Sequence, residues 1–261
     1  MKKRFLASVL ATLMLLTMLP TGAFAAEDDA TIVPQETMND GTAQTPVVQS
    51  GDEEDTSNSS IYLDPTTGDD AKDGKTAENA VKTLTKAFEI AGDGDTVYLL
   101  SNIVLSSETV LSGDKSITLA GNAGEAAPTI KYSWDGVTTN NLYMIEIGAE
   151  SGTSTQTNIT LRNLTVDAEA QDIRCLRVCP GSQLILADGA TVRNGRAINQ
   201  DGTTGTSDWG GGIVVDNGAK LTMEDSSSIT GCSAEWGGAV YLSGEMEING
   251  GEISNNTAVG D

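Results

Sequence analysis

The chain of 261 residues contains no histidine, and only 4% of its residues are aromatic. The missing imidazole excludes, within this sequence, the hydrolases and lyases whose mechanism depends on a histidine. The scarcity of aromatic side chains argues against a β-sandwich, which has longer alternating strands and large aromatic core residues. The 29 glycines instead suit short strands joined by tight turns, with little helix.

Positive charge is also scarce, because 15 Lys and Arg residues stand against 37 Asp and Glu residues, for a net charge of −22. Such a chain lacks the basic surface that binds nucleic acid or an anionic membrane. Calcium and neutral glycans remain compatible partners. An acidic surface also keeps an exported repeat protein in solution without any ligand.

Cysteine occurs three times, an odd number for an exported chain. Cys175 and Cys179 flank an extended segment, so their Cα atoms should lie about 13 Å apart, too far for a disulfide. At most, Cys232 pairs with one of them. No histidine or fourth thiol completes a zinc site, so we predict mainly unpaired, structural cysteines.

The first 25 residues predict a secretory signal peptide and therefore a secreted or cell-surface protein. Three basic residues precede an apolar run from Phe5 to Leu19, and Ala23-Phe24-Ala25 offers a small-residue cleavage site. Residues 26–60 are rich in acidic, Thr, Ser and Pro residues and lack Lys and Arg, which predicts a disordered acidic linker. No second apolar run is long enough to span a membrane, so we expect no membrane insertion after signal removal.

A repeat dominates the C-terminal part of the chain. Trp209-Gly-Gly-Gly-Ile-Val-Val215 and Trp236-Gly-Gly-Ala-Val-Tyr-Leu242 are the same phrase 27 residues apart, and apolar segments recur every eight residues after them. Strands this short cannot bury a face alone, but coils of three strands stacked in a solenoid can. We therefore predict an all-β fold over residues 97–261, a right-handed parallel β-helix with three short strands per coil.

Residues 61–96 predict the N-terminal end of this solenoid. A strand at Ile61 and a turn-rich loop precede residues 79–91, whose apolar residues have helical spacing. The first coil of a solenoid exposes its interior and an unpaired strand edge. We predict that the helix over residues 79–91 covers this end.

These segments resemble known families. Ile61-Tyr-Leu-Asp-Pro65, Lys82-Thr-Leu-Thr-Lys-Ala87 and Gly94-Asp-Thr-Val-Tyr-Leu99 are similar to the start of pectate-lyase-like β-helix proteins. The Gly-Gly phrases and Ile253-Ser-Asn-Asn-Thr-Ala258 resemble the polymorphic outer-membrane and adhesin-like repeats of bacterial surface proteins. The last repeat stops where the next Gly-Gly is expected, so we expect further coils and a surface anchor beyond Asp261.

The resemblance leaves two functions open, since this fold hosts lyases, hydrolases, epimerases and non-catalytic adhesins. We favour a non-catalytic adhesin-like or glycan-contacting module that meets a host or cell-wall surface. The alternative is a polysaccharide lyase or glycoside hydrolase. Pectate-type lyases use calcium and an Arg or Lys base, as the resemblance implies, and the loops over 121–141, 148–158 and 199–212 are long enough to wall a cleft. The nearest charged residues are Arg162, Asp167, Glu169, Asp172, Arg174 and Arg177. They match no catalytic signature, so we predict no catalytic residue.

The repeat also suggests a carbohydrate-binding site. Asp208-Trp209 and Glu235-Trp236 should occupy the same turn on adjacent coils, about 5 Å apart. Paired carboxylates beside paired indoles suit a sugar, and Tyr241 in the second phrase is a further candidate. A ladder stacked for packing alone is the other interpretation, and the insertion over 199–208 can disturb the register.

Four aspartates crowd the loop after the first strand: Asp64, Asp69, Asp70 and Asp73. Calcium is the natural candidate ligand, and no other cofactor is predicted. The EF-hand pattern fails, because Ala71 and Ala80 occupy the third and twelfth positions when Asp69 is the first. A looser oxygen cage and an ordinary Asp/Gly turn both remain open.

Overall fold

The computed structural model describes residues 59–122, 125–133, 143–149, 156–197 and 208–260. The chain divides into two units, Met1–Glu53 and Glu54–Asp261, and everything described below belongs to the second. The predicted signal peptide and nearly all of the predicted linker lie outside the described residues. Within those residues, no helix has the length and apolar character needed to cross a membrane.

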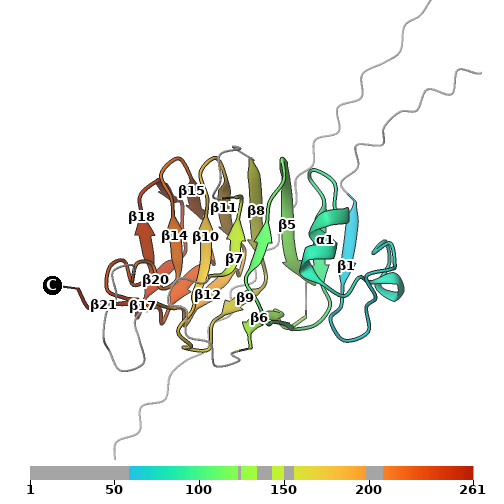
Figure 1. Ribbon diagram of the computed structural model, residues 1–261, viewed down its shortest axis with the longest axis horizontal. Helices are drawn as coiled ribbons and strands as arrows, with labels where there is room; N and C mark the ends of the chain where they lie inside the picture. Colours follow the sequence, from blue (N-terminus) through green and yellow to red (C-terminus); the bar gives the residue numbers. More distant parts are fainter. Residues whose placement is uncertain (1–58, 123–124, 134–142, 150–155, 198–207, 261) are drawn as a thin grey trace, which may run out of the picture. The chain divides into compact units, whose positions relative to one another are not determined.

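The regular secondary structure of the second unit is almost entirely β-strand, and the strands pair in parallel to form four sheets (Figure 1). Sheet A contains β1 (Ser60–Leu63), β2 (Thr96–Leu99), β5 (Lys115–Gly121), β8 (Thr157–Arg162), β11 (Gln183–Ala187), β15 (Lys220–Met223) and β19 (Glu245–Ile248). Sheet B contains β3 (Ile103–Leu105), β6 (Thr129–Tyr132), β9 (Thr165–Asp167), β12 (Thr191–Arg193), β16 (Ser228–Thr230) and β20 (Glu252–Ser254). Sheet C contains β4 (Thr109–Leu111), β7 (Tyr143–Ile147), β10 (Arg174–Val178), β14 (Ile213–Val215) and β18 (Val240–Leu242). Sheet D contains β13 (Arg196–Ala197), β17 (Ser233–Ala234) and β21 (Thr257–Ala258).

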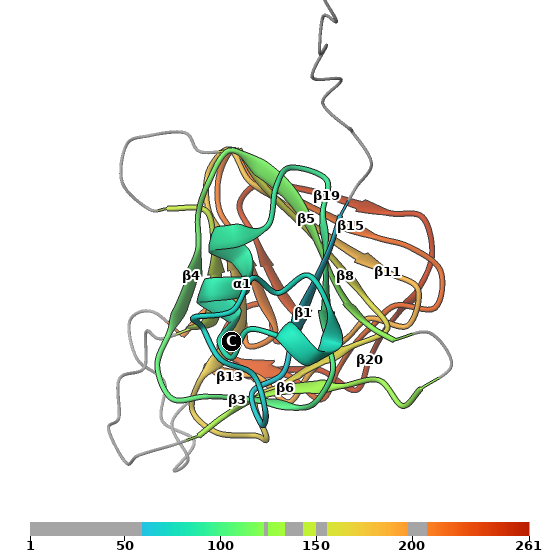
Figure 2. The ribbon, with the colours of Figure 1, turned by 90° about the vertical axis from the view of Figure 1, so that its right-hand side faces the viewer.

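The chain visits sheets C, A and B in turn, and each strand pairs with its equivalent on the next coil. Thus β10, β11 and β12 pair with β14, β15 and β16, which pair in turn with β18, β19 and β20. This connectivity is consistent with a parallel β-helix, and Figure 2 shows the ribbon surrounding a common interior. The apolar segments with eight-residue spacing lie on these strands, as predicted.

Sheet D was not predicted, because three strands per coil were expected. Its two-residue strands lie between sheets B and C, and their alanines pair across the coils, as Ala197 does with Ala234. Ser-Ala and Thr-Ala segments have no apolar periodicity to reveal them. Glycines permit the close packing here, since a Cβ atom on Gly195 would lie 2.0 Å from the Gly211 carbonyl oxygen.

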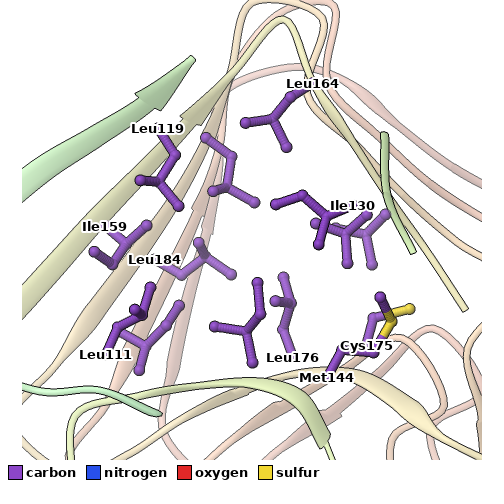
Figure 3. Close-up of a cluster of buried hydrophobic side chains, with 14 of the residues drawn as sticks. Leu111, Leu119, Ile130, Met144, Ile159, Leu164, Cys175, Leu176 and Leu184 are labelled. Carbon is purple, nitrogen blue, oxygen red and sulfur yellow. The ribbon is translucent and has the colours of Figure 1, made fainter. Parts of the chain in front are cut away.

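Apolar side chains from sheets A, B and C fill the interior in stacked columns (Figure 3). Ile159 and Leu184 are register partners on sheet A and are at most 1% exposed, and they face Ile130 from sheet B and Leu176 from sheet C. Full burial of one such side chain contributes about 1.5–3 kcal/mol. The columns therefore supply the stability that no single short strand has.

A helix covers the N-terminal end of the columns (Figure 2). After a 3₁₀ turn, η1 (Ala77–Asn79), the helix α1 (Leu84–Ile90) buries Leu84, Ala87 and Phe88. The predicted start at residue 79 was wrong, because Val81 forms a parallel β-bridge with Leu63. The helix begins only after Thr83, whose hydroxyl accepts a hydrogen bond from the Lys86 amide at 3.2 Å and caps the first turn.

The three cysteines are free and buried. The pKa of the Cys175 thiol is raised well above its ordinary value, mainly by its hydrogen bond with Cys232 and also by burial. Burial also raises the pKa of Cys179 to about 12. Since the thiolate is the reactive form, Cys175 and Cys179 act as small core side chains.

Candidate functional site

The Gly-Gly phrases bring two tryptophans together on neighbouring coils. Trp209 and Trp236 form a parallel β-bridge, and the Trp236 carbonyl accepts a hydrogen bond from Gly210 N at 2.9 Å. The amides of Glu235 and Trp236 both donate to the Asp208 carbonyl, at 3.0 and 3.2 Å. The repeat therefore keeps its register at this turn, although residues 199–207 of the insertion lie outside the described residues.

The glycine after each tryptophan turns the chain into sheet C. Gly210 and Gly237 have φ values of +65° and +64°, a left-handed conformation that side chains with a Cβ rarely adopt. A Cβ atom on Gly210 would also lie 2.4 Å from Cγ2 of Val214 and 3.1 Å from Cβ of Tyr241. The phrase thus fixes the backbone that presents each indole.

Three rings form an exposed aromatic surface, which we define as Trp209, Trp236 and Tyr241. The rings of Trp209 and Tyr241 stack with their centroids 5.0 Å apart and their planes 13° apart. Trp209 remains 42% exposed and Trp236 remains 46% exposed. Large apolar rings left this accessible on adjacent coils are available to a ligand.

The two predicted carboxylates are not equivalent. Asp208 is only 1% exposed, whereas Glu235 is partly exposed beside Trp236. Below them lies Arg174, itself 2% exposed, whose Nε donates to the Trp209 carbonyl at 2.7 Å. Burial lowers the pKa of this guanidinium, while the nearby Tyr143 and Asp208 act in the opposite direction. Asp208 and Arg174 thus lie beneath the aromatic surface and are not available on it.

An ion-pair cluster on sheet C was missed from the sequence, apart from its arginine. Arg177 donates from Nε to Asp216 at 3.0 Å and from an η nitrogen to Glu146 at 3.2 Å, and its guanidinium carbon lies 5.5 Å from the Tyr143 ring centre. Glu146, Arg177, Val214 and Tyr241 are consecutive register partners on β7, β10, β14 and β18. Glu146 and Arg177 therefore lie in the same file, meaning one line of register partners across the strands, as Tyr241 of the aromatic surface. Its only sequence signal is the polar Glu146 interrupting an apolar strand at the register of Arg177.

The remaining charged candidates do not gather around a site. Arg162 pairs with Asp188, Asp167 with Arg193, Glu169 with Lys131 and Asp172 with Arg196. Burial opposes ionisation of Asp167, but hydrogen bonds from Asn194, the Glu169 amide and Arg193 outweigh it and lower its pKa. These pairs are distributed along the coils, and each satisfies its own charges.

The four aspartates of the first loop hold separate parts of the backbone. Asp64 accepts hydrogen bonds from Thr66, Thr67 and Ser101, and Asp70 accepts from the amides of Lys82 and Thr83. Asp69 and Asp73 each accept from the amide two residues ahead. Among the described residues, no group of three or more acidic, cysteine or histidine side chains is placed to hold a metal ion. Calcium binding here stays a prediction.

Comparison with known proteins gives one structural likeness. No family model matches the chain, and no curated protein does. Among solved structures, a rhamnogalacturonan lyase superposes with a TM-score of 0.39 at 14% sequence identity, over 74% of this chain. The chain spans 62% of that lyase, so any likeness concerns only part of its length. The fold described above therefore rests on strand pairing.

Proposed function

We propose that this chain is a secreted or cell-surface β-helix module that binds a neutral glycan through the aromatic surface, without catalysing a reaction. The proposal rests on one observation, the exposed rings of Trp209 and Trp236 on neighbouring coils together with the partly exposed ring of Tyr241. Flat indole and phenol faces pack well against the apolar face of a pyranose. The right-handed coil, the signal peptide over residues 1–25 and the adhesin-like role belong to the same proposal and rest on the sequence.

The charges around the aromatic surface favour a neutral ligand over a polyuronate. Arg177 is already shared between Glu146 and Asp216, and Arg174 and Asp208 are both buried. Glu235 adds a further carboxylate beside Trp236. An acidic glycan would therefore meet more negative than positive charge, on a chain whose net charge is already −22.

A polysaccharide lyase is the alternative, and it needs a base at the same surface. Arg177 is the accessible cation there, but two carboxylates at 3.0 and 3.2 Å favour its protonated form. Binding without chemistry is therefore the better-supported function.

The test is calorimetric titration with cellohexaose, mannohexaose, xylohexaose and oligogalacturonate, using the chain from residue 26 onward. We expect a neutral hexasaccharide to bind, and Trp209→Ala and Trp236→Ala each to weaken it about tenfold, which corresponds to roughly 1.4 kcal/mol. Tyr98→Ala is the matched control, because Tyr62 and Tyr98 also stack, 5.8 Å apart, but on sheet A.

Two results would contradict this function. Binding that is unchanged in both tryptophan variants would remove the aromatic surface from it. Formation of an unsaturated product from polygalacturonate, lost in Arg177→Gln, would establish the lyase instead.

A further inference from the structure

A groove crosses the outside of sheet A, away from the aromatic surface. It consists of two hollows, of about 390 and 380 Å³, which meet at Asn158. The first extends from Asn158 toward Asp93 and Asp114, and the second extends toward Glu245. The groove therefore runs across the strands, from coil to coil.

One side chain from each of five consecutive strands lines this groove. These residues are register partners on β5, β8, β11, β15 and β19: Ser116, Asn158, Gln183, Lys220 and Glu245. Adjacent strands are about 4.8 Å apart, so these five side chains follow one another at that interval and together span about 19 Å. The turns that enter the strands form one wall of the second hollow, with Gly181, Gly218 and Gly244 among their residues.

The centre of the file consists of uncharged amides with unused hydrogen-bonding groups. Asn158 donates from Nδ2 to Ser116 at 3.2 Å, and Gln183 donates from Nε2 to Thr222 at 3.3 Å. Within the described part of the chain, neither amide oxygen accepts a hydrogen bond. Both side chains are partly exposed, so each offers an acceptor and a donor hydrogen to the groove.

The charges along the groove disfavour a polyanion. Asp93, Asp114 and Glu245 line it, while the ammonium group of Lys220 is paired with Glu247 at 2.7 Å. Lys115 donates to the carbonyls of Phe88 and Ala91 at the end of α1, so its charge is directed to the helix. The hydroxyl groups of a neutral ligand can hydrogen-bond to the amides, and they are not repelled by these carboxylates.

We propose that this groove is a second binding site, for an extended neutral glycan that lies across the strands of sheet A. Successive sugar hydroxyls would exchange hydrogen bonds with the amides of Asn158 and Gln183. Because the groove spans about 19 Å, a hexasaccharide binds more tightly than a disaccharide of the same sugar. The site shares no residue with the aromatic surface, so it stands whether or not that surface binds.

The experiment compares cellohexaose, mannohexaose and xylohexaose with their disaccharides by calorimetry and by amide chemical shifts. We expect Asn158→Ala with Gln183→Ala to weaken hexasaccharide binding at least tenfold and to remove the shifts along sheet A. Thr160→Ala is the matched control, since Thr160 lies on β8 in the neighbouring file, whose partners are Thr118 and Ile185. Gln183→Glu tests the groove with nearly unchanged side-chain volume, and a normal thermal melt establishes folding.

The outcomes separate this proposal from the aromatic surface. Loss in the amide variants but not in Trp209→Ala supports the groove. Loss only in Trp209→Ala overturns the groove and supports the aromatic surface. Equal loss in Thr160→Ala, or no binding of any of the three hexasaccharides at millimolar concentration, also overturns it.

Discussion

The first and last coils carry the same apolar columns but differ in what covers them. At the N-terminal end, Leu84 and Phe88 of α1 are 3% and 6% exposed where the helix packs on β1 and β4. On the last described coil, Ile248 and Ile253 are 59% and 44% exposed, although their register partners Met223 and Ile229 are fully buried. Burial of an apolar residue in this fold therefore depends on a neighbouring coil or helix that covers it, and the alternation of apolar residues within its own strand is not sufficient.

The largest expected effect is at the helix. Phe88→Asp places a carboxylate against the first coil, and burial of an unpaired charge should lower the free energy of unfolding by at least about 3 kcal/mol. Thermal unfolding and size-exclusion chromatography measure the loss and the resulting soluble aggregates. Ile253→Asp is the control at the other end and should change little. If Phe88→Asp melts like the unsubstituted chain and stays monomeric, α1 does not protect the first coil.

Two register partners on sheet A sharpen the comparison. Leu221 is fully buried on β15, and Met246 is its partner on β19, only partly buried. Leu221→Ala should cost about 2–5 kcal/mol, because it leaves a cavity between coils, and Met246→Ala should cost well under half as much. Urea unfolding at constant m-value tests this ordering, and equal costs would refute it.

Acid should act on the N-terminal end through Asp95. Burial opposes ionisation of this carboxylate, but hydrogen bonds from Gly92 N and from Ser59 outweigh it and lower its pKa. Since the folded-state pKa lies below the unfolded value of about 3.9, the stabilisation is present above that pH and is lost as the pH falls through the folded-state pKa.

Asp95→Asn therefore measures the pH dependence directly. At pH 7 it should reduce the free energy of unfolding by about 1 kcal/mol, as expected for hydrogen bonds to a charged acceptor that is partly screened by solvent. Below the folded-state pKa the two proteins should converge in urea titrations. A difference that is the same at pH 7 and in acid would show that the charge plays no part.

The smallest effect is expected at the exposed column. Ile248→Ser removes an apolar side chain that is already 59% exposed, so the free energy of unfolding, measured with urea, should fall by no more than about 0.5 kcal/mol. Met223→Ser, one coil earlier in the same column, should cost several times more. Similar costs at both positions would mean that another layer covers Ile248 in solution.

Local repetition made most of the fold predictable. The eight-residue spacing located Leu176, Leu184 and Val192 on successive strands, and the Trp-Gly-Gly phrase predicted the pairing of Trp209 with Trp236. Both signals come from residues that recur at fixed intervals. The helix was found from its apolar spacing, but Val81 belongs to a bridge with Leu63 that no local pattern reveals.

The site was less predictable, because burial of its charges depends on distant partners. The sequence of β10 gives no sign that Arg174 is buried, yet it is 2% exposed and donates a hydrogen bond to the Trp209 carbonyl, 35 residues further along the chain. Asp208 and Glu235 lie at the same turn of adjacent coils, as predicted, yet only Glu235 reaches solvent. Glu146 and Asp216 contact Arg177 from neighbouring coils, and apart from the polar Glu146 on an apolar strand, the sequence does not reveal these contacts.

The pairing of unequal coils has a consequence for how such a surface can change. Leu184 pairs with Leu221, 37 residues on, and Leu221 pairs with Met246, only 25 residues on, yet both pairs are adjacent rungs of sheet A. Strand pairing sets the distances between coils, and the turns absorb the difference in length. Insertions at a turn can therefore reshape the rim of a binding surface while its spacing is inherited unchanged, so recognition can diversify at little risk to the scaffold.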